Sequence, residues 1–319
     1  MAFHDRQGLK ETAWQRLGSA ATDPRKLMLV YVGVSSVAML LVTGLNFLLT
    51  EQIAGTGGLG GLGTRAVLET AMEVLQTAAN LLLPFWTMGY LSCVLKIVRG
   101  QRFEVSNLLD GFRNFWPVLR LNILYSVQFF VLAFLCLYPC ILVYSMTPLS
   151  APLMELLEPV AQAGTEIVLD DATMEAATMA MIPLFILYGV AFLAVAAPRF
   201  YNYRMAFYAL MDDPGAGARI ALHRSTVMMQ GNRLELLKLD ASFWWFYVLD
   251  GLTVALCYAD LILGMMGISL PVSADVSYFL FYVLYLAAQL GLYVWARNRV
   301  ECTYAAGYNT LLEELAQAQ

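Results

Sequence analysis

The stretch DPRKLMLVYVGVSSVAMLLVTGLNFLL, residues 23–49, decides the fold. Asp23-Pro24 is a common start of a helix, and no charged side chain follows between Leu27 and Leu49. A helix needs about 20 mostly apolar residues to cross the hydrocarbon core of a bilayer. The apolar run is too long for the core of a signal peptide, and no small-x-small cleavage site follows it. We therefore expect a retained membrane span.

Further segments of the same kind follow along the chain. The six predicted spans are residues 27–49, 75–95, 117–144, 178–198, 241–263 and 276–296. The sequence is 60% apolar and 13% charged, whereas soluble domains carry roughly 25% charged residues. We expect one polytopic all-α membrane domain, residues 1–319, built as a six-helix transmembrane bundle.

The basic residues predict how the chain is oriented. All but one of the 19 Lys and Arg residues fall in the N-terminal segment, around the second and fourth connections, or in the C-terminal tail. The exception is Arg65. Lys and Arg accumulate on the cytoplasmic side of membrane proteins. We expect a multi-pass protein of the cell (plasma) membrane with cytoplasmic N- and C-termini.

Short amphipathic segments lie on the predicted cytoplasmic side, at residues 8–19, 105–116, 214–230 and 302–315. Their apolar residues form one stripe of helical period, and basic flanks suit the headgroup layer. The first three share one design, an amphipathic helix and then a glycine and a basic residue before a span. This predicts three repeats, each an interfacial helix plus a helical hairpin. Alternatively, any cytoplasmic loop between spans has this pattern. The last segment covers the inner face of the bundle or lies on the membrane.

The most specific pattern is RFYNYRMAFYALMDDPGAGARIALHRSTVMMQGNRLELLKLDASFWW, residues 199–245. It combines a tyrosine-rich helix, D-x-P, an amphipathic helix ending in S-x-x-M-M-x-G-N-(K/R), and the span entry L-x-L-x-x-S-F-x-W. This resembles an uncharacterised bacterial integral membrane protein family, similar to the membrane domain of some glycerophosphodiester phosphodiesterases. The resemblance implies a helical membrane fold and supplies no catalytic residues.

One acidic residue is unusual because of its depth. Asp250 lies about nine residues into the fifth span, or about 14 Å from its start. An ionisable side chain inside a membrane is a functional candidate by default. Asp250 could bind a proton or cation, or pair with Arg120 at the start of the third span. Alternatively, Asp250 bonds to nearby Ser, Tyr or backbone groups, and Arg120 extends to the inner headgroups.

Four arginines of the predicted cytoplasmic side are candidate contacts for anionic lipid headgroups: Arg199, Arg204, Arg219 and Arg233. Alternatively, they only set the orientation of the chain. The two histidines, His4 and His223, lie apart in polar segments, so we predict no metal site, no catalytic constellation and no cofactor.

The sequence thus predicts an integral membrane protein, not an enzyme, that handles or transports lipids or small amphiphiles. The alternative is a non-catalytic membrane scaffold or a partner subunit of a larger complex. The expected partners are membrane lipids. The net charge of -5 gives no indication of a nucleic-acid partner. The sequence does not indicate whether the chain binds a protein partner or forms a homo-oligomer.

Overall fold

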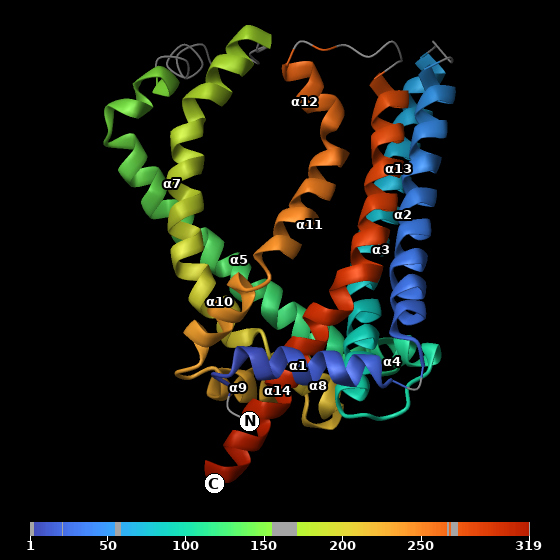
Figure 1. Cartoon of the computed structure of the whole chain (residues 1–319). Helices are drawn as coiled ribbons and strands as arrows, with labels where there is room; N and C mark the ends of the chain where they lie inside the picture. The colour runs from blue at the N-terminus through green and yellow to red at the C-terminus, as the bar shows by residue number, and fades with distance from the viewer. Residues whose placement is uncertain are drawn as a thin grey trace. The chain divides into compact units, whose positions relative to one another are not determined.

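A computed structural model describes residues 3–20, 22–54, 59–154, 171–266, 268 and 274–318, and every regular element within these ranges is helical (Figure 1). The chain forms two compact units. Unit 1 comprises Met1–Arg120 and Met205–Gln319, and unit 2 comprises Leu121–Arg204. The helical fold class expected from the sequence is thus found throughout the described part of the chain.

Five described segments are long and apolar enough to cross a membrane: Pro24–Leu45, Glu73–Val98, Phe115–Ser145, Ala176–Asp212 and Val276–Gln317. These segments fall on the longest helices, which are α2 (Pro24–Ala54), α3 (Leu59–Val98), α5 (Phe115–Ser145), α7 (Asp171–Tyr203) and α13 (Ala274–Leu292) with its continuation. Their length and composition support a membrane protein.

The predicted fifth span, residues 241–263, is not one continuous helix, so the six-span count is not confirmed. The range is divided among the end of α10 (Arg233–Ala241), then α11 (Trp244–Cys257) and α12 (Ala259–Met265). The Phe243 amide donates to the Asp240 carbonyl at 2.9 Å, and the Tyr258 amide donates to the Ala255 carbonyl at 3.2 Å, each three residues back instead of four. These local bonds replace helical ones. Alone, α11 extends about 21 Å, short of a hydrocarbon core about 30 Å thick.

Short helices of unit 1 gather in the lower part of Figure 1, where α1 packs on α14 and where η1 and α4 pack on α3. They are α1 (Arg6–Gly18), η1 (Val105–Leu109), α4 (Asp110–Arg113), α8 (Ala206–Asp212), α9 (Ala218–Met228) and α10. With α14 (Asn298–Ala318), we call them the short-helix layer. α14 continues α13 through the π-helical turn η4 (Tyr293–Arg297). Residues 300–308 of α14 are buried, so the predicted helix at 302–315 packs inside unit 1.

Two of the predicted interfacial helices are interrupted. Residues 105–116 form η1, α4 and the start of α5, because Asn114 ends α4 by donating its side-chain amide to the Asp110 carbonyl at 2.9 Å. Residues 214–230 begin with η3 (Pro214–Ala216), and α9 starts only after Gly217, whose φ is 83°. Residues 8–19 agree with α1. The three structural repeats stay a prediction.

One helix crossing in unit 1 depends on glycine. A Cβ atom at Gly89 of α3 would lie 1.8 Å from the Leu108 carbonyl oxygen, and one at Gly111 would lie 1.9 Å from the Phe85 carbonyl oxygen. Both distances are far below van der Waals contact. The backbones of α3 and of η1–α4 therefore touch, which places η1–α4 directly against α3.

Unit 2 contains the later part of α5, the short turn η2 (Pro148–Ser150) and α7. Cys140, Tyr144 and Leu184 form its small buried cluster. The Tyr144 hydroxyl donates to the Ala180 carbonyl at 2.6 Å and so links the two long helices.

Candidate functional site

Polar side chains recur on α14 at positions 298, 301, 304 and 308. This spacing of three or four residues places them on one side of the helix. Asn298 accepts a hydrogen bond from the Tyr90 hydroxyl at 2.9 Å and donates to the Pro24 carbonyl at 2.8 Å. Glu301 accepts from the Tyr208 hydroxyl at 2.8 Å and lies 3.7 Å from an Arg297 nitrogen. Both residues are buried, and these bonds fix α14 against α2, α3 and α8.

We call this row of polar residues the α14 stripe, and its last two members, Tyr304 and Tyr308, form similar links. Tyr304 donates to the Asp240 carboxylate, and the hydroxyls of Tyr304 and Tyr247 lie 2.8 Å apart. Tyr308 donates to Asp212 at 3.0 Å. The stripe therefore joins α14 to α8, α10 and α11. Because its polar groups are used in these links, we interpret the stripe as structural.

Asp212 also pairs with Arg99, which follows α3. The hydrogen bond from Arg99 to this carboxylate is the main cause that raises the pKa of the Arg99 guanidinium. Arg99 donates in addition to Asn309 Oδ1, at 3.0 and 3.1 Å. The end of α3 is thus fixed to α8 and α14 by charge-assisted bonds.

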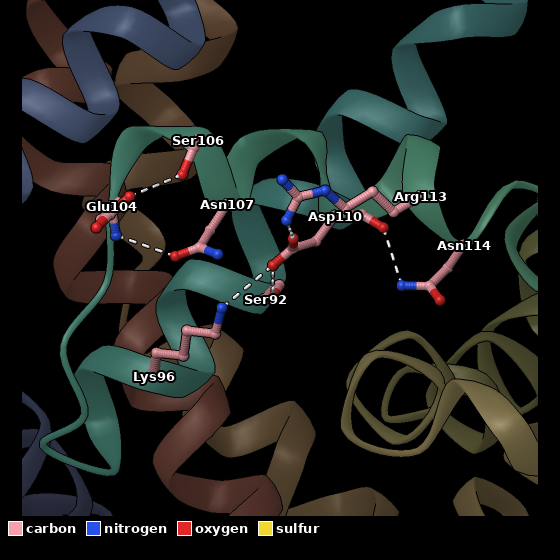
Figure 2. Close-up of polar contacts among 8 residues, drawn as sticks. All are labelled: Ser92, Lys96, Glu104, Ser106, Asn107, Asp110, Arg113 and Asn114. Atoms are coloured by element: carbon pink, nitrogen blue, oxygen red, sulfur yellow. Dashed lines mark hydrogen bonds and ion pairs between the residues drawn. The ribbon is translucent and has the colours of Figure 1, made fainter.

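A second polar cluster surrounds Asp110 at the start of α4, as Figure 2 shows. Its carboxylate accepts from Ser92 at 3.0 Å, from Lys96 at 3.2 Å and from Arg113 at 3.0 Å. Figure 2 also shows the capping of η1, where the Glu104 amide donates to Asn107 Oδ1 at 3.0 Å. Two cations, Lys96 and Arg113, pair with the Asp110 carboxylate. This cluster therefore fixes α4 to α3, and both carboxylate oxygens are already bonded.

A cavity of about 710 Å³ opens elsewhere in unit 1, between α1, the start of α2 and the η4–α14 junction. Its walls come from three elements that are far apart in sequence. The lining residues are Trp14, Leu17, Gly18, Ala20, Asp23, Pro24, Arg25, Val294, Trp295, Asn298 and Arg299. We call it the Trp14–Trp295 pocket. Its volume is in the range of pockets that hold small ligands.

Both tryptophans of the pocket are solvent-accessible although they are large and apolar. Trp14 is 42% exposed and Trp295 is 56% exposed. The Arg299 guanidinium lies 5.8 Å from the centre of the Trp14 ring, and Trp295 contacts Trp245 edge to face at 5.3 Å. Exposed tryptophan beside arginine is typical of the boundary between hydrocarbon and headgroups.

The packing of α1 positions one wall of this pocket. The Asp5 carboxylate caps α1 by accepting from the Gly8 amide at 3.0 Å, and Leu9 and Ala13 are buried. Lys10 donates to the Ser242 carbonyl at 3.4 Å and lies 4.3 Å from the centre of the Phe243 ring. Burial, and then the charge of Arg6, lower the pKa of Lys10. Trp14, four residues after Lys10 on α1, lines the pocket.

Asp250 lies on α11, outside this pocket. Its Oδ1 atom is buried without a hydrogen-bond partner among the described residues. The Asp250 carboxylate interacts with Tyr293 by charge and by a side-chain hydrogen bond, and the Tyr293 hydroxyl also lies 3.4 Å from the amide nitrogen of Gln289. Within the described ranges, no ion pair links Asp250 to the exposed Arg120. The two candidate residues are thus not brought together as an ion pair.

The four arginines expected at headgroups are divided between the units. Arg199 and Arg204 belong to unit 2, where the Arg204 guanidinium lies 5.9 Å from the centre of the Phe200 ring. Arg219 and Arg233 belong to unit 1 and are exposed on or at the start of α9 and α10. None of the four lines the Trp14–Trp295 pocket.

Sequence reasoning did not select the cations of this pocket, Arg25 and Arg299. Each lies beside a predicted span, where basic residues are expected for orientation alone. The signal that could have distinguished them is an adjacent tryptophan on an amphipathic segment, such as Trp14. Their convergence itself depends on how α2 packs against η4 and α14, which neither local pattern predicts.

Comparison with known proteins identifies the family of the chain. The family described as "Protein of unknown function (DUF975)" matches residues 1–288. No curated protein matches the chain, and no solved structure does. The expected similarity to membrane domains of glycerophosphodiester phosphodiesterases is not supported by this match. An uncharacterised family was expected from the motif at residues 199–245, and the chain belongs to the DUF975 family of proteins of unknown function.

Proposed function

We propose that this DUF975 protein is a multi-pass membrane protein that takes lipids or small amphiphiles into the Trp14–Trp295 pocket at the cytoplasmic ends of its spans. The proposal depends on one observation. A cavity of about 710 Å³ combines two exposed tryptophans with two arginines beside the first residues of α2.

The position of the pocket along the spans supports an amphiphile as its ligand. Pro24 begins the apolar helix α2, and Val294 and Trp295 follow the apolar helix α13. One side of the pocket is thus continuous with surfaces that suit acyl chains. The other side carries Arg25 and Arg299, which suit a polar headgroup. A ligand with both characters satisfies both sides.

The proposed role is binding or transfer, without chemical turnover. Among the described residues that line the pocket, the only carboxylate is Asp23, and none is a Ser, Cys or His that could act as a nucleophile or base. General acid–base catalysis needs a positioned proton donor and acceptor pair. The lining offers hydrogen bonding, charge and stacking instead.

The test is native mass spectrometry of the full-length protein, released from membranes in mild detergent. We expect bound lipid on the wild type and a several-fold loss of it in a Trp14→Ala/Trp295→Ala variant. The matched control is Trp116→Ala/Trp244→Ala, because both of these tryptophans are exposed in unit 1 and neither lines the pocket. The control should retain its lipid.

Equal lipid retention by the two double variants would contradict the proposal. A wild type that releases all lipid but retains a stable protein partner would favour the scaffold alternative.

A further inference from the structure

The Trp14–Trp295 pocket has a defined charge pattern. Its lining contains two cations, Arg25 and Arg299, and one carboxylate, Asp23. No carboxylate within the described ranges pairs with either guanidinium. The lining therefore has a formal excess of one positive charge, which favours an anionic group as its occupant.

Asp23 is already engaged by the start of α2. Its Oδ1 atom accepts a hydrogen bond from the Arg25 amide at 2.9 Å, and its carbonyl accepts from the Lys26 amide at 3.1 Å. This carboxylate therefore caps α2 rather than neutralising the Arg25 side chain. The same bonds occupy the first amides of α2. A ligand anion would have to be bound by the arginine side chains.

The two guanidiniums differ from other basic groups of unit 1. Arg99 pairs with Asp212, Arg113 pairs with Asp110, and Arg224 pairs with Asp213 at 3.2 Å. Arg299 instead lies over the Trp14 ring, and this contact leaves its N–H groups able to donate in the plane of the guanidinium. Arginine is well suited to binding phosphate through two parallel hydrogen bonds.

We propose that the pocket binds the phosphodiester group of an anionic glycerolipid, whose headgroup carries no cation that would cancel the phosphate charge. In this arrangement Arg25 and Arg299 bind the two non-bridging phosphate oxygens, and the acyl chains leave past Val294 and Trp295. This inference rests on the proposed function and specifies the chemistry of its ligand. It adds a requirement that lipid binding alone does not make, namely a phosphodiester headgroup with a net charge of −1.

The net charge of the lining favours a diester over a monoester. A phosphodiester carries one negative charge at neutral pH and balances the excess positive charge of the pocket. A phosphomonoester carries about −1.5 to −2 at pH 7, so it would add uncompensated negative charge close to Asp23. A phosphodiester lipid should therefore bind more tightly than a phosphatidic acid with the same acyl chains.

The experiment measures lipid exchange into the full-length protein in nanodiscs of phosphatidylcholine with added phosphatidylglycerol. Native mass spectrometry gives the ratio of the two lipids on the ejected protein. We expect enrichment of phosphatidylglycerol on the wild type. Arg25→Ala/Arg299→Ala should reduce this enrichment about tenfold or more, because two charge-assisted hydrogen-bonding groups are lost.

A matched variant, Arg219→Ala/Arg233→Ala, removes the same charge from exposed positions outside the pocket and should keep the enrichment. Arg25→Lys/Arg299→Lys should recover only part of it, because lysine retains the charge without the planar fork. Unchanged elution and thermal unfolding of each variant would show that a loss of binding is not a loss of fold.

Two further ligands distinguish the source and the charge of the phosphate. Soluble glycerophosphoglycerol has the same diester without acyl chains and should not displace the lipid at equal concentration. Phosphatidic acid should bind more weakly than phosphatidylglycerol. Displacement by the soluble diester, or stronger binding of phosphatidic acid, would overturn the proposal.

The outcomes also separate this inference from the proposed function. Lipid that is retained through Trp14 and Trp295 but shows no preference for phosphatidylglycerol over phosphatidylcholine would refute the site for an anionic phosphodiester headgroup alone. Absence of any pocket-dependent lipid would refute both.

Discussion

At the scale of single residues, the glycines at the α3–α4 crossing give a direct prediction. Gly89→Ala places a methyl group where the Leu108 carbonyl lies, at a distance of 1.8 Å, and backbone cannot rotate away as a side chain can. We expect destabilisation of about 1–3 kcal/mol or more, in the range of overpacked cores. Thermal unfolding of the detergent-solubilised protein measures it.

The control is Gly33→Ala in α2, where an added Cβ meets nothing within 4 Å. Alanine favours a helix over glycine by up to about 1 kcal/mol, so this change should be neutral or stabilising. Similar losses at both positions would mean that the close crossing is not the cause.

Glu235 gives a residue-scale prediction about pH. The hydrogen bond from Lys238, at 2.6 Å, is the main cause that lowers the pKa of this carboxyl below its ordinary value of 4.5. The unfolded state therefore binds the proton more readily than the folded state. Stability from Glu235 is fully present above pH 4.5 and is lost as the pH falls through the lower, folded pKa.

The stability difference between wild type and Glu235→Gln should therefore be constant near neutral pH and shrink in acid. Lys238→Met should make this difference smaller at neutral pH by removing the main partner. Thermal unfolding over a pH series checks both expectations. A difference that grows in acid would contradict the sign.

At the scale of elements, the division of the predicted fifth span changes how Asp250 is interpreted. Its helix, α11, has only 14 residues, and the Asp250 Oδ1 atom has no hydrogen-bond partner within the described ranges. A buried carboxylate oxygen without a hydrogen-bond partner costs free energy. We expect Asp250→Asn to raise the unfolding temperature, because the isosteric amide removes the charge and can donate to Tyr293.

Differential scanning fluorimetry of the purified variant tests this, with Asp23→Ala at an exposed position as a comparison that should lower stability by removing the α2 cap. A fall in the unfolding temperature of Asp250→Asn would show that the carboxylate has a stabilising partner.

The elements were predictable to different degrees. Long apolar runs such as residues 27–49 identify α2 directly, because membrane spans need only length and apolarity. The short helices depend on capping and on neighbours. Residues 105–116 have an amphipathic pattern, yet the Asn114 side chain and the contact of Gly111 with α3 divide them into η1, α4 and α5. The π-turn η4 has no sequence signal that we could identify.

The candidate site also contains one feature that the sequence indicates and one that it does not. Asp250 was evident from the sequence because a charge inside an apolar run needs no tertiary information. The pocket was not, since Arg25 and Arg299 are separated by almost the whole chain and line one pocket only through the packing of α2 against η4 and α14. Sequence periodicity reports which face of a helix is apolar but not which helix covers it.

At the scale of the whole molecule, the orientation of the chain stays a prediction from its basic residues. A cysteine introduced at Arg219 should react with a membrane-impermeant maleimide only after cells are opened. Thr147→Cys, in the predicted outer connection after α5, should react in intact cells. The wild type gives the background from its own cysteines, of which Cys93, Cys140 and Cys302 are buried. Labelling at position 219 from outside would reverse the proposed arrangement.

The position of α14 has a consequence for biosynthesis. Its residues 300–308 are the buried centre of the short-helix layer, and Phe3 donates its amide to Glu314 at 3.0 Å. The ribosome makes α1 first, whereas its main partner, α14, emerges only after α2, α3 and α13 have been synthesised. The layer therefore closes after translation of these helices, and until then the apolar side of α1 stays available to the bilayer surface or to a chaperone. A chain truncated by a stop codon before residue 298 would lack α14, and the apolar side of α1 would therefore never be covered by it.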